Sequence, residues 1–161
     1  MTQNTLTTLY NHNLWANTKL LEQCAGLSDE QLDSTIIGTF GTIRDTVRHI
    51  ATAERSYFSR ISTGKRYPSQ EDERLSMSDA LELSRKTGAG FVEWATKVRG
   101  EETVEVQWED DEIKQIPKAI IMTQAINHAT EHRSQIMAIM TQLGIEPPEL
   151  DAWSYFLEHE K

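Results

Sequence analysis

Two histidines, His128 and His132, stand four residues apart in the segment NHATEHRSQ, with Glu131 between them. In an α-helix four residues make about one turn, so both imidazoles would project from one face, one above the other. Their nitrogens could bind a single metal ion at an N–metal distance of about 2.0–2.1 Å. Glu131 lies about 60° from His128 on such a helix and could orient a ligand or accept a proton, although a solvated glutamate explains it equally well.

The helical wheel places both histidines in the apolar face of their segment, where an imidazole without a partner is costly to bury. Three interpretations stay open from this pattern. The histidines could bind a metal, they could form a hydrogen-bonded cluster, or the helix could be less buried than its pattern indicates. The polar residues that could complete a cluster are Asn13, Asn17, Gln124 and Gln135.

A tight metal site needs a third ligand. His49, in RDTVRHIATAE, is the other histidine that falls inside a long apolar helical pattern. It sits at the shoulder of that apolar stripe, about 100° from Ile50, so its ring could turn inward or outward. His12 and His159 are expected to be solvated.

Helical periodicity dominates the chain and predicts four long amphipathic helices. Thr42 and Ser76 are expected N-caps, and Gly64 and Gly144 are expected stops. The predicted segments run from about Thr5 to Cys24, from Ile43 to Gly64, from Ser76 to Gly100 and from Pro117 to Leu143. Four such segments predict an all-α four-helix bundle, whose helix order the pattern leaves open.

Shorter elements lie between and after these helices. Ser28 with Gln31 three residues later predicts a short helix that starts with a capping box. Residues 103–116 alternate apolar and polar side chains around EDDE, which predicts a small hairpin or an extended crossover before the last long helix. KRYPSQEDER is expected to be a loop, and LDAWSYFLEH a short terminal helix that lays Trp153, Phe156 and Leu157 on the body.

The sequence indicates the roles of several other residues less specifically. Asn13 and Asn17 fall in the buried stripe of the first helix, where they could bind substrate or a ligand's N–H, although core-spanning structural asparagines are the favoured interpretation. Cys24 lies on the same stripe and is expected to be an inert core thiol. The tryptophans are expected to be packing residues: Trp15, Trp94, Trp108 and Trp153.

Composition excludes several classes of protein. The 161 residues predict one domain, 1–161, of ordinary globular composition, with 38% hydrophobic and 25% charged residues. A net charge of −9 with scattered basic residues argues against nucleic-acid binding. No apolar run is long enough for a membrane span, and we expect no signal peptide. A single cysteine fits the reducing cytoplasm.

Three blocks of the sequence resemble the DinB/YfiT-like superfamily of metalloenzymes. They are YNHNLWANTKLLEQCAGLSDEQLD, GTIRDTVRHIATAERSYFSRI and NHATEHRSQIMAIMTQLGIEPPELDAWSYF, in the family's order and covering nearly the whole chain. The resemblance implies a four-helix bundle, commonly homodimeric, with one metal held by a histidine of the second helix and an H-x-x-x-H pair. Those ligands fall on His49, His128 and His132, and Zn or Ni is the expected ion.

Three imidazoles around a divalent ion leave a coordination position open, as in catalytic sites. The superfamily includes transferases that use bacillithiol, mycothiol or glutathione, so the resemblance implies a metal-dependent transferase acting on a small molecule with a low-molecular-weight thiol. A bundle that only senses or sequesters a ligand is the alternative. A metal-dependent hydrolase is a minor alternative, because HATEH also fits the H-x-x-E-H pattern of inverted zinc peptidases.

Overall fold

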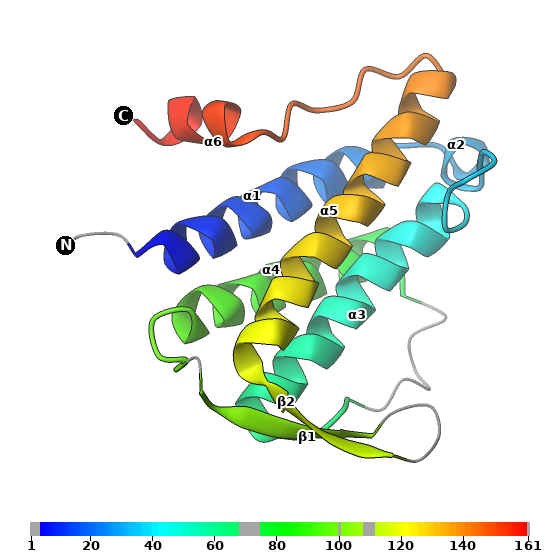
Figure 1. Cartoon of the computed structure of the whole chain (residues 1–161). Helices are drawn as coiled ribbons and strands as arrows, with labels where there is room; N and C mark the ends of the chain where they lie inside the picture. The colour runs from blue at the N-terminus through cyan, green and yellow to red at the C-terminus, as the bar shows by residue number, and fades with distance from the viewer. Residues whose placement is uncertain (1–3, 68–74, 100, 108–111, 161) are drawn as a thin grey trace.

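A computed structural model describes residues 4–67, 75–99, 101–107 and 112–160 of the chain. These residues form six helices and one antiparallel two-stranded hairpin (Figure 1). The elements are α1 (Thr5–Ala25), α2 (Asp29–Leu32), α3 (Ile43–Thr63), α4 (Met77–Trp94), β1 (Thr103–Gln107), β2 (Ile113–Pro117), α5 (Lys118–Gln142) and α6 (Ala152–His159). The predicted all-α four-helix bundle, the hairpin and the short terminal helix are all confirmed.

Local capping explains where most helices begin and end. Ser28 and Gln31 form the predicted capping box, and the Thr42 and Ser76 side chains cap α3 and α4. The predicted stops, Gly64 and Gly144, have φ values of 74° and 71°, which glycine adopts without steric cost.

Two predicted boundaries are wrong. The third long helix does not continue toward residue 100: α4 ends at Trp94, and residues 95–97 form a turn. The turn is needed because the chain must reverse into the hairpin, where Val104 is buried. Pro117 is not in the first turn of α5 but precedes it as the N-cap, because it is still paired with Thr103 in the hairpin.

The four long helices run up, down, down and up. Going around the bundle, α1 is followed by α4, α3 and α5, so α3 lies antiparallel to α5 and parallel to α4 (Figure 1). Pairs of contacts give these directions. They are Tyr10–Phe91 and Glu22–Arg85 between α1 and α4, and Glu54–Ser84 and Phe58–Phe91 between α3 and α4. Tyr10–Met122 and Asn17–Arg133 join α1 and α5, while Tyr57 on α3 and Phe40 just before α3 contact His128 and His132 on α5.

The interior consists of two apolar clusters with polar side chains between them. One cluster contains Leu20, Ile50 and Ile136, and the other contains Tyr10 and Phe91. Between the clusters each long helix contributes buried polar residues, which we call the polar layer: Asn13 and Asn17 from α1, Glu54 from α3, Ser84 from α4 and Arg133 from α5. The layer therefore crosses the whole bundle near its middle.

The C-terminal helix corrects two predictions. Trp153, Phe156 and Leu157 do not lie on the body, because they are 80%, 51% and 65% exposed. Instead α6 contacts α1 through Tyr155, whose ring meets His12 edge-on at 5.7 Å. His12 is therefore not solvated: it is half-buried, and its Nε2 lies 2.8 Å from the carbonyl oxygen of Leu150.

Of the remaining predictions, some are confirmed and others concern residues that the structure does not describe. His159 is exposed as expected, and Cys24 is fully buried, with its pKa raised to about 12 by burial. Trp15 and Trp94 are partly buried. Trp108, most of the EDDE turn, residues 68–74 of the predicted loop and Gly100 lie outside the described residues. Within the described ranges, no helix combines the length and apolar character needed to cross a membrane.

Candidate metal centre

The structure brings the three predicted histidines together. His49 on α3 meets His128 and His132 on α5, and one nitrogen from each imidazole lies within 4.8 Å of the other two. The ring of His49 is turned inward across the seam between α3 and α5, which settles the orientation that its shoulder position left open. His132 is 7% exposed, and the other two rings are half-buried.

Aromatic side chains contact all three rings. Phe40, in the loop before α3, stacks on His49 with centroids 4.1 Å apart and meets the edge of His132. Tyr57, two turns beyond His49, meets His128 edge-on at 5.6 Å. Phe40 and Tyr57 were not identified from the sequence. Phe40 precedes α3, and no helical period links it to the histidines.

A hydrogen bond fixes the tautomer of His132. Its Nδ1 lies 2.9 Å from Oε1 of Gln135, and the same oxygen accepts a hydrogen bond from the backbone N–H of Phe40. Because a backbone N–H can only donate, this amide atom must be the carbonyl oxygen, and Nδ1 of His132 must carry the proton. The lone pair of His132 is therefore on Nε2, as a metal ligand requires.

Two of the three histidines have lowered pKa values. The pKa of His128 is lowered to about 4, mainly by burial and to a smaller extent by the adjacent His132 and His49. The pKa of His49 is also lowered, first by burial and then by His132. Nε2 of His128 lies 2.9 Å from Nε2 of His49, a distance at which one nitrogen must donate to the other if nothing else lies between them.

These residues fit a divalent ion. Neutral imidazoles are the ligands that Zn, Ni, Cu and Fe accept, and two nitrogens bound at about 2.0–2.1 Å to one ion lie at most about 4.2 Å apart. A spread of up to 4.8 Å closes to that limit with side-chain shifts of a few tenths of an ångström. Among the described residues, the cluster contains no carboxylate, so three neutral ligands would leave the ion its full charge and an open position.

The other predicted site residues lie elsewhere. Glu131 is exposed on α5. Asn13 and Asn17 belong to the polar layer, where both amide nitrogens donate to Glu54 Oε1 at 3.0 and 3.2 Å. Their carbonyl oxygens accept from the Arg133 guanidinium at 2.7 and 2.6 Å. This arrangement is the structural alternative favoured by the sequence.

Glu54 and Arg133 were missed by the sequence analysis. Burial raises the pKa of Glu54 to about 7, against the opposing effects of Ser84, Arg133 and the two asparagines. Burial lowers the pKa of Arg133 to about 10, so its guanidinium stays charged at neutral pH. A signal existed: Glu54 follows Ile50 by four residues and Val47 by seven, which places a carboxylate on the apolar stripe of α3.

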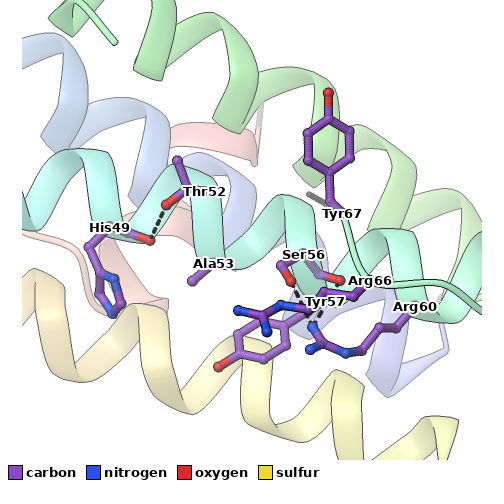
Figure 2. Close-up of a pocket in the computed structure, with 8 residues that line it drawn as sticks. All are labelled: His49, Thr52, Ala53, Ser56, Tyr57, Arg60, Arg66 and Tyr67. Atoms are coloured by element: carbon purple, nitrogen blue, oxygen red, sulfur yellow. Dashed lines mark hydrogen bonds between the residues drawn. The ribbon is translucent and has the colours of Figure 1, made fainter. Parts of the chain in front are cut away.

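A cavity of about 310 Å³ adjoins His49 (Figure 2). Its lining comes from α3 and from the residues just after that helix: His49, Thr52, Ala53, Ser56, Tyr57, Arg60, Arg66 and Tyr67. The volume lies at the lower end of the range for small-molecule sites. The triad therefore has a neighbouring space in which a small molecule could lie.

A helical bundle with three histidines on one seam defines a class of candidate metal-binding proteins, and comparisons show the family to which the chain belongs. The DinB family matches residues 1–160, so the chain belongs to the DinB family. A search of curated proteins finds no match.

Solved structures share the fold at low sequence identity. YfiT from Bacillus subtilis, described as a "probable metal-dependent hydrolase with an unusual four-helix bundle topology", aligns with a TM-score of 0.68 at 15% identity, over 86% of this chain and 87% of its own. A DinB-like protein from Bacillus subtilis aligns with a TM-score of 0.67 at 14% identity, over 92% and 99%. Another from Bacillus cereus gives 0.62 at 23%, over 87% and 91%.

Proposed function

We propose that His49, His128 and His132 bind one divalent metal ion and that the protein is a metal-dependent transferase that joins a low-molecular-weight thiol to an electrophilic small molecule. The observation that carries the metal site is the convergence of three imidazoles, one nitrogen of each within 4.8 Å of the other two. The thiol chemistry rests on resemblance to the superfamily. The implied homodimer stays a prediction.

The chain's own residues would prepare this site. Gln135 keeps the proton of His132 on Nδ1, and Phe40 holds the ring of His49 against rotation. The apolar surroundings keep His49 and His128 unprotonated near pH 7, so protons compete weakly for the ligand nitrogens. A bound divalent ion would supply Lewis acidity and would hold a thiol as its thiolate. The adjoining cavity would position the second substrate.

The metal site is tested by elemental analysis of untagged protein purified without added metal, and after metal loading. We expect about one ion per chain in the wild type and in His159→Ala, which removes an exposed histidine from α6. His132→Ala should lose the ion while its circular dichroism stays helical, because the polar layer and both apolar clusters are untouched. Wild-type protein that neither carries nor takes up metal would refute the site.

Thiol transfer is tested on the metal-loaded protein with glutathione, bacillithiol and mycothiol, each with a model electrophile. Thiol consumption above the uncatalysed rate, lost in His132→Ala, is the expected result. Absence of any thiol-dependent rate, with a change of ligand affinity on His132→Ala instead, would identify a non-enzymatic binding bundle.

A metal-dependent hydrolase is the second candidate, because YfiT, with the same fold, is described as one. The same metal-loaded protein would then cleave ester or amide substrates with water and without any thiol. Hydrolysis that persists when thiols are omitted would replace the transferase assignment and leave the metal site intact.

A further inference from the structure

Two arginines face the cavity next to His49. Arg60 is half-buried on α3, and Arg66 is exposed just beyond the helix. Figure 2 shows their guanidinium groups on the side of α3 that carries the imidazole of His49, beside the ring of Tyr57. Two positive charges therefore line a space that opens toward the triad.

None of the eight residues that line the cavity in the described part of the chain is acidic. Arg60 donates to Ser56, at 2.7 Å to the hydroxyl and 3.4 Å to the backbone carbonyl. Both partners are neutral. The pKa of Arg60 is lowered first by burial and then by the charge of Arg66. In a chain with a net charge of −9, adjacent arginines without a lining carboxylate are unexpected from composition alone.

The remaining lining gives the cavity two chemically different ends. His49 marks one end, and Thr52 and Ala53 lie between it and the arginines along α3. Tyr57 contacts His128 with its ring and also lines the cavity, so it links the triad to the arginine end. Tyr67 forms another wall, held by Arg55, whose guanidinium carbon lies 3.8 Å over the ring.

We propose that this cavity is an anion subsite in which Arg60 and Arg66 bind the carboxylate or phosphate group of a small substrate, so that the rest of the molecule extends toward the triad. Guanidinium groups bind both oxyanions through paired N–H donors, which makes the class of ligand clear and leaves its source to experiment. The orientation toward the triad rests on the proposed metal-dependent function. The anion binding itself does not.

The test is an NMR titration of the ¹⁵N-labelled full chain with inorganic phosphate and, separately, with succinate, at constant ionic strength set by chloride. The arginine side-chain Nε–Hε signals report the location of binding. Each titration is run on chelator-treated protein and on metal-loaded protein. The variants are Arg60→Gln, Arg66→Gln and the control Arg99→Gln, which removes the same charge from an exposed position outside the cavity.

We expect saturable shifts of the Arg60 and Arg66 signals in wild type and Arg99→Gln, with or without metal. Each cavity substitution should weaken binding about tenfold or more, since a hydrogen bond to a charged group is being removed. Tighter binding of succinate identifies a carboxylate ligand, and tighter binding of phosphate identifies a phosphate ligand. If Arg60→Gln does not fold, the exposed Arg66→Gln still decides the matter.

Three results would overturn the subsite. The first is no saturable shift in the wild type, and the second is equal binding in Arg66→Gln and Arg99→Gln. The third is binding that disappears on metal removal and does not depend on either cavity arginine, because the anion would then be bound to the ion. Failure of metal uptake with arginine-dependent anion binding intact would refute the proposed function and leave the subsite standing.

Discussion

The polar layer and the histidine triad lie at neighbouring positions on the same two helices. Glu54 follows His49 by five residues on α3, and Arg133 follows His132 directly on α5. The polar layer lies at the centre of the bundle, where all four long helices contribute to it. The triad lies on the seam between α3 and α5 alone, with a cavity beside it.

The polar layer satisfies itself. Glu54 accepts from Asn13, Asn17 and Ser84, and the two amide carbonyls accept from Arg133. Donors face acceptors throughout, and a carboxylate is present to offset the guanidinium. Burying such a network costs desolvation free energy, but its hydrogen bonds are made within the protein, so no ligand is needed to satisfy them.

The triad lacks that closure. Gln135 provides an acceptor for His132, but the remaining contact joins a nitrogen of His128 to a nitrogen of His49. A neutral imidazole carries one proton and one lone pair, and the lone pair that Nδ1 protonation leaves on Nε2 of His132 is not among the buried unpartnered atoms of the described residues, so it stays accessible. The polar layer is closed by its own hydrogen bonds, whereas the triad presents imidazole nitrogens that a cation could bind.

The largest expected effect comes from breaking the polar layer. Arg133→Met removes the guanidinium and leaves the carboxylate of Glu54 buried without a cation. We expect a loss of about 3–5 kcal/mol in the free energy of unfolding at pH 8. The measurement is urea denaturation with chelator present, so that metal binding does not contribute.

The loss should shrink at pH 5.5. Burial raises the pKa of Glu54 from its ordinary 4.5 to about 7, so the folded chain holds this proton more tightly than the unfolded chain. Stability from this group is therefore present at low pH and falls as pH rises through that window. Removing Arg133 raises the pKa further, which deepens the loss at alkaline pH. Arg85→Met, at an exposed pair with Glu22, is the control and should change little. A loss independent of pH would contradict this account of Glu54.

A second effect concerns the hydrogen bond between His132 of the triad and Gln135. Gln135→Leu keeps the size of the side chain but removes the acceptor that holds the proton of His132 on Nδ1. Loss of such a partner typically weakens metal binding by about 10–100-fold. Competition with a chelating dye would measure it. Gln124→Leu, at an exposed glutamine on the same helix, should bind metal as the wild type does. Equal affinity in both variants would show that the tautomer is fixed in another way.

The difference between the polar layer and the histidine triad also explains what the sequence could predict. Helices and caps depend on local patterns, and Thr42, Ser76 and Gly64 all act as expected. The pair His128 and His132 was predictable because one helix fixes their relation. The wheel alone could not orient His49, since its ring is held by Phe40 from outside the helix.

Tertiary contacts account for the predictions that failed. Periodicity correctly identified the apolar face of α6, but it does not show which part of the protein that face contacts. Contacts of His12 and Trp15 with Tyr155 set the position of this eight-residue helix, and Trp153 consequently points away. The charged residues of the polar layer, Glu54 and Arg133, escaped prediction because they lie on different helices, and only the folded bundle brings them together.

The smallest expected effect concerns Glu131, the carboxylate nearest the triad in sequence, and tests the distinction between the triad and the polar layer. Glu131 is exposed, whereas the buried carboxylate of this region, Glu54, belongs to the polar layer. Glu131→Gln should therefore change stability and metal-binding free energy by no more than about 0.5 kcal/mol. If Glu131 acts as a general base, turnover alone should fall, by about 10²–10⁴-fold. Loss of metal in this variant would mean that a carboxylate joins the ligand set, and the contrast between an all-imidazole triad and a charge-balanced layer would fail.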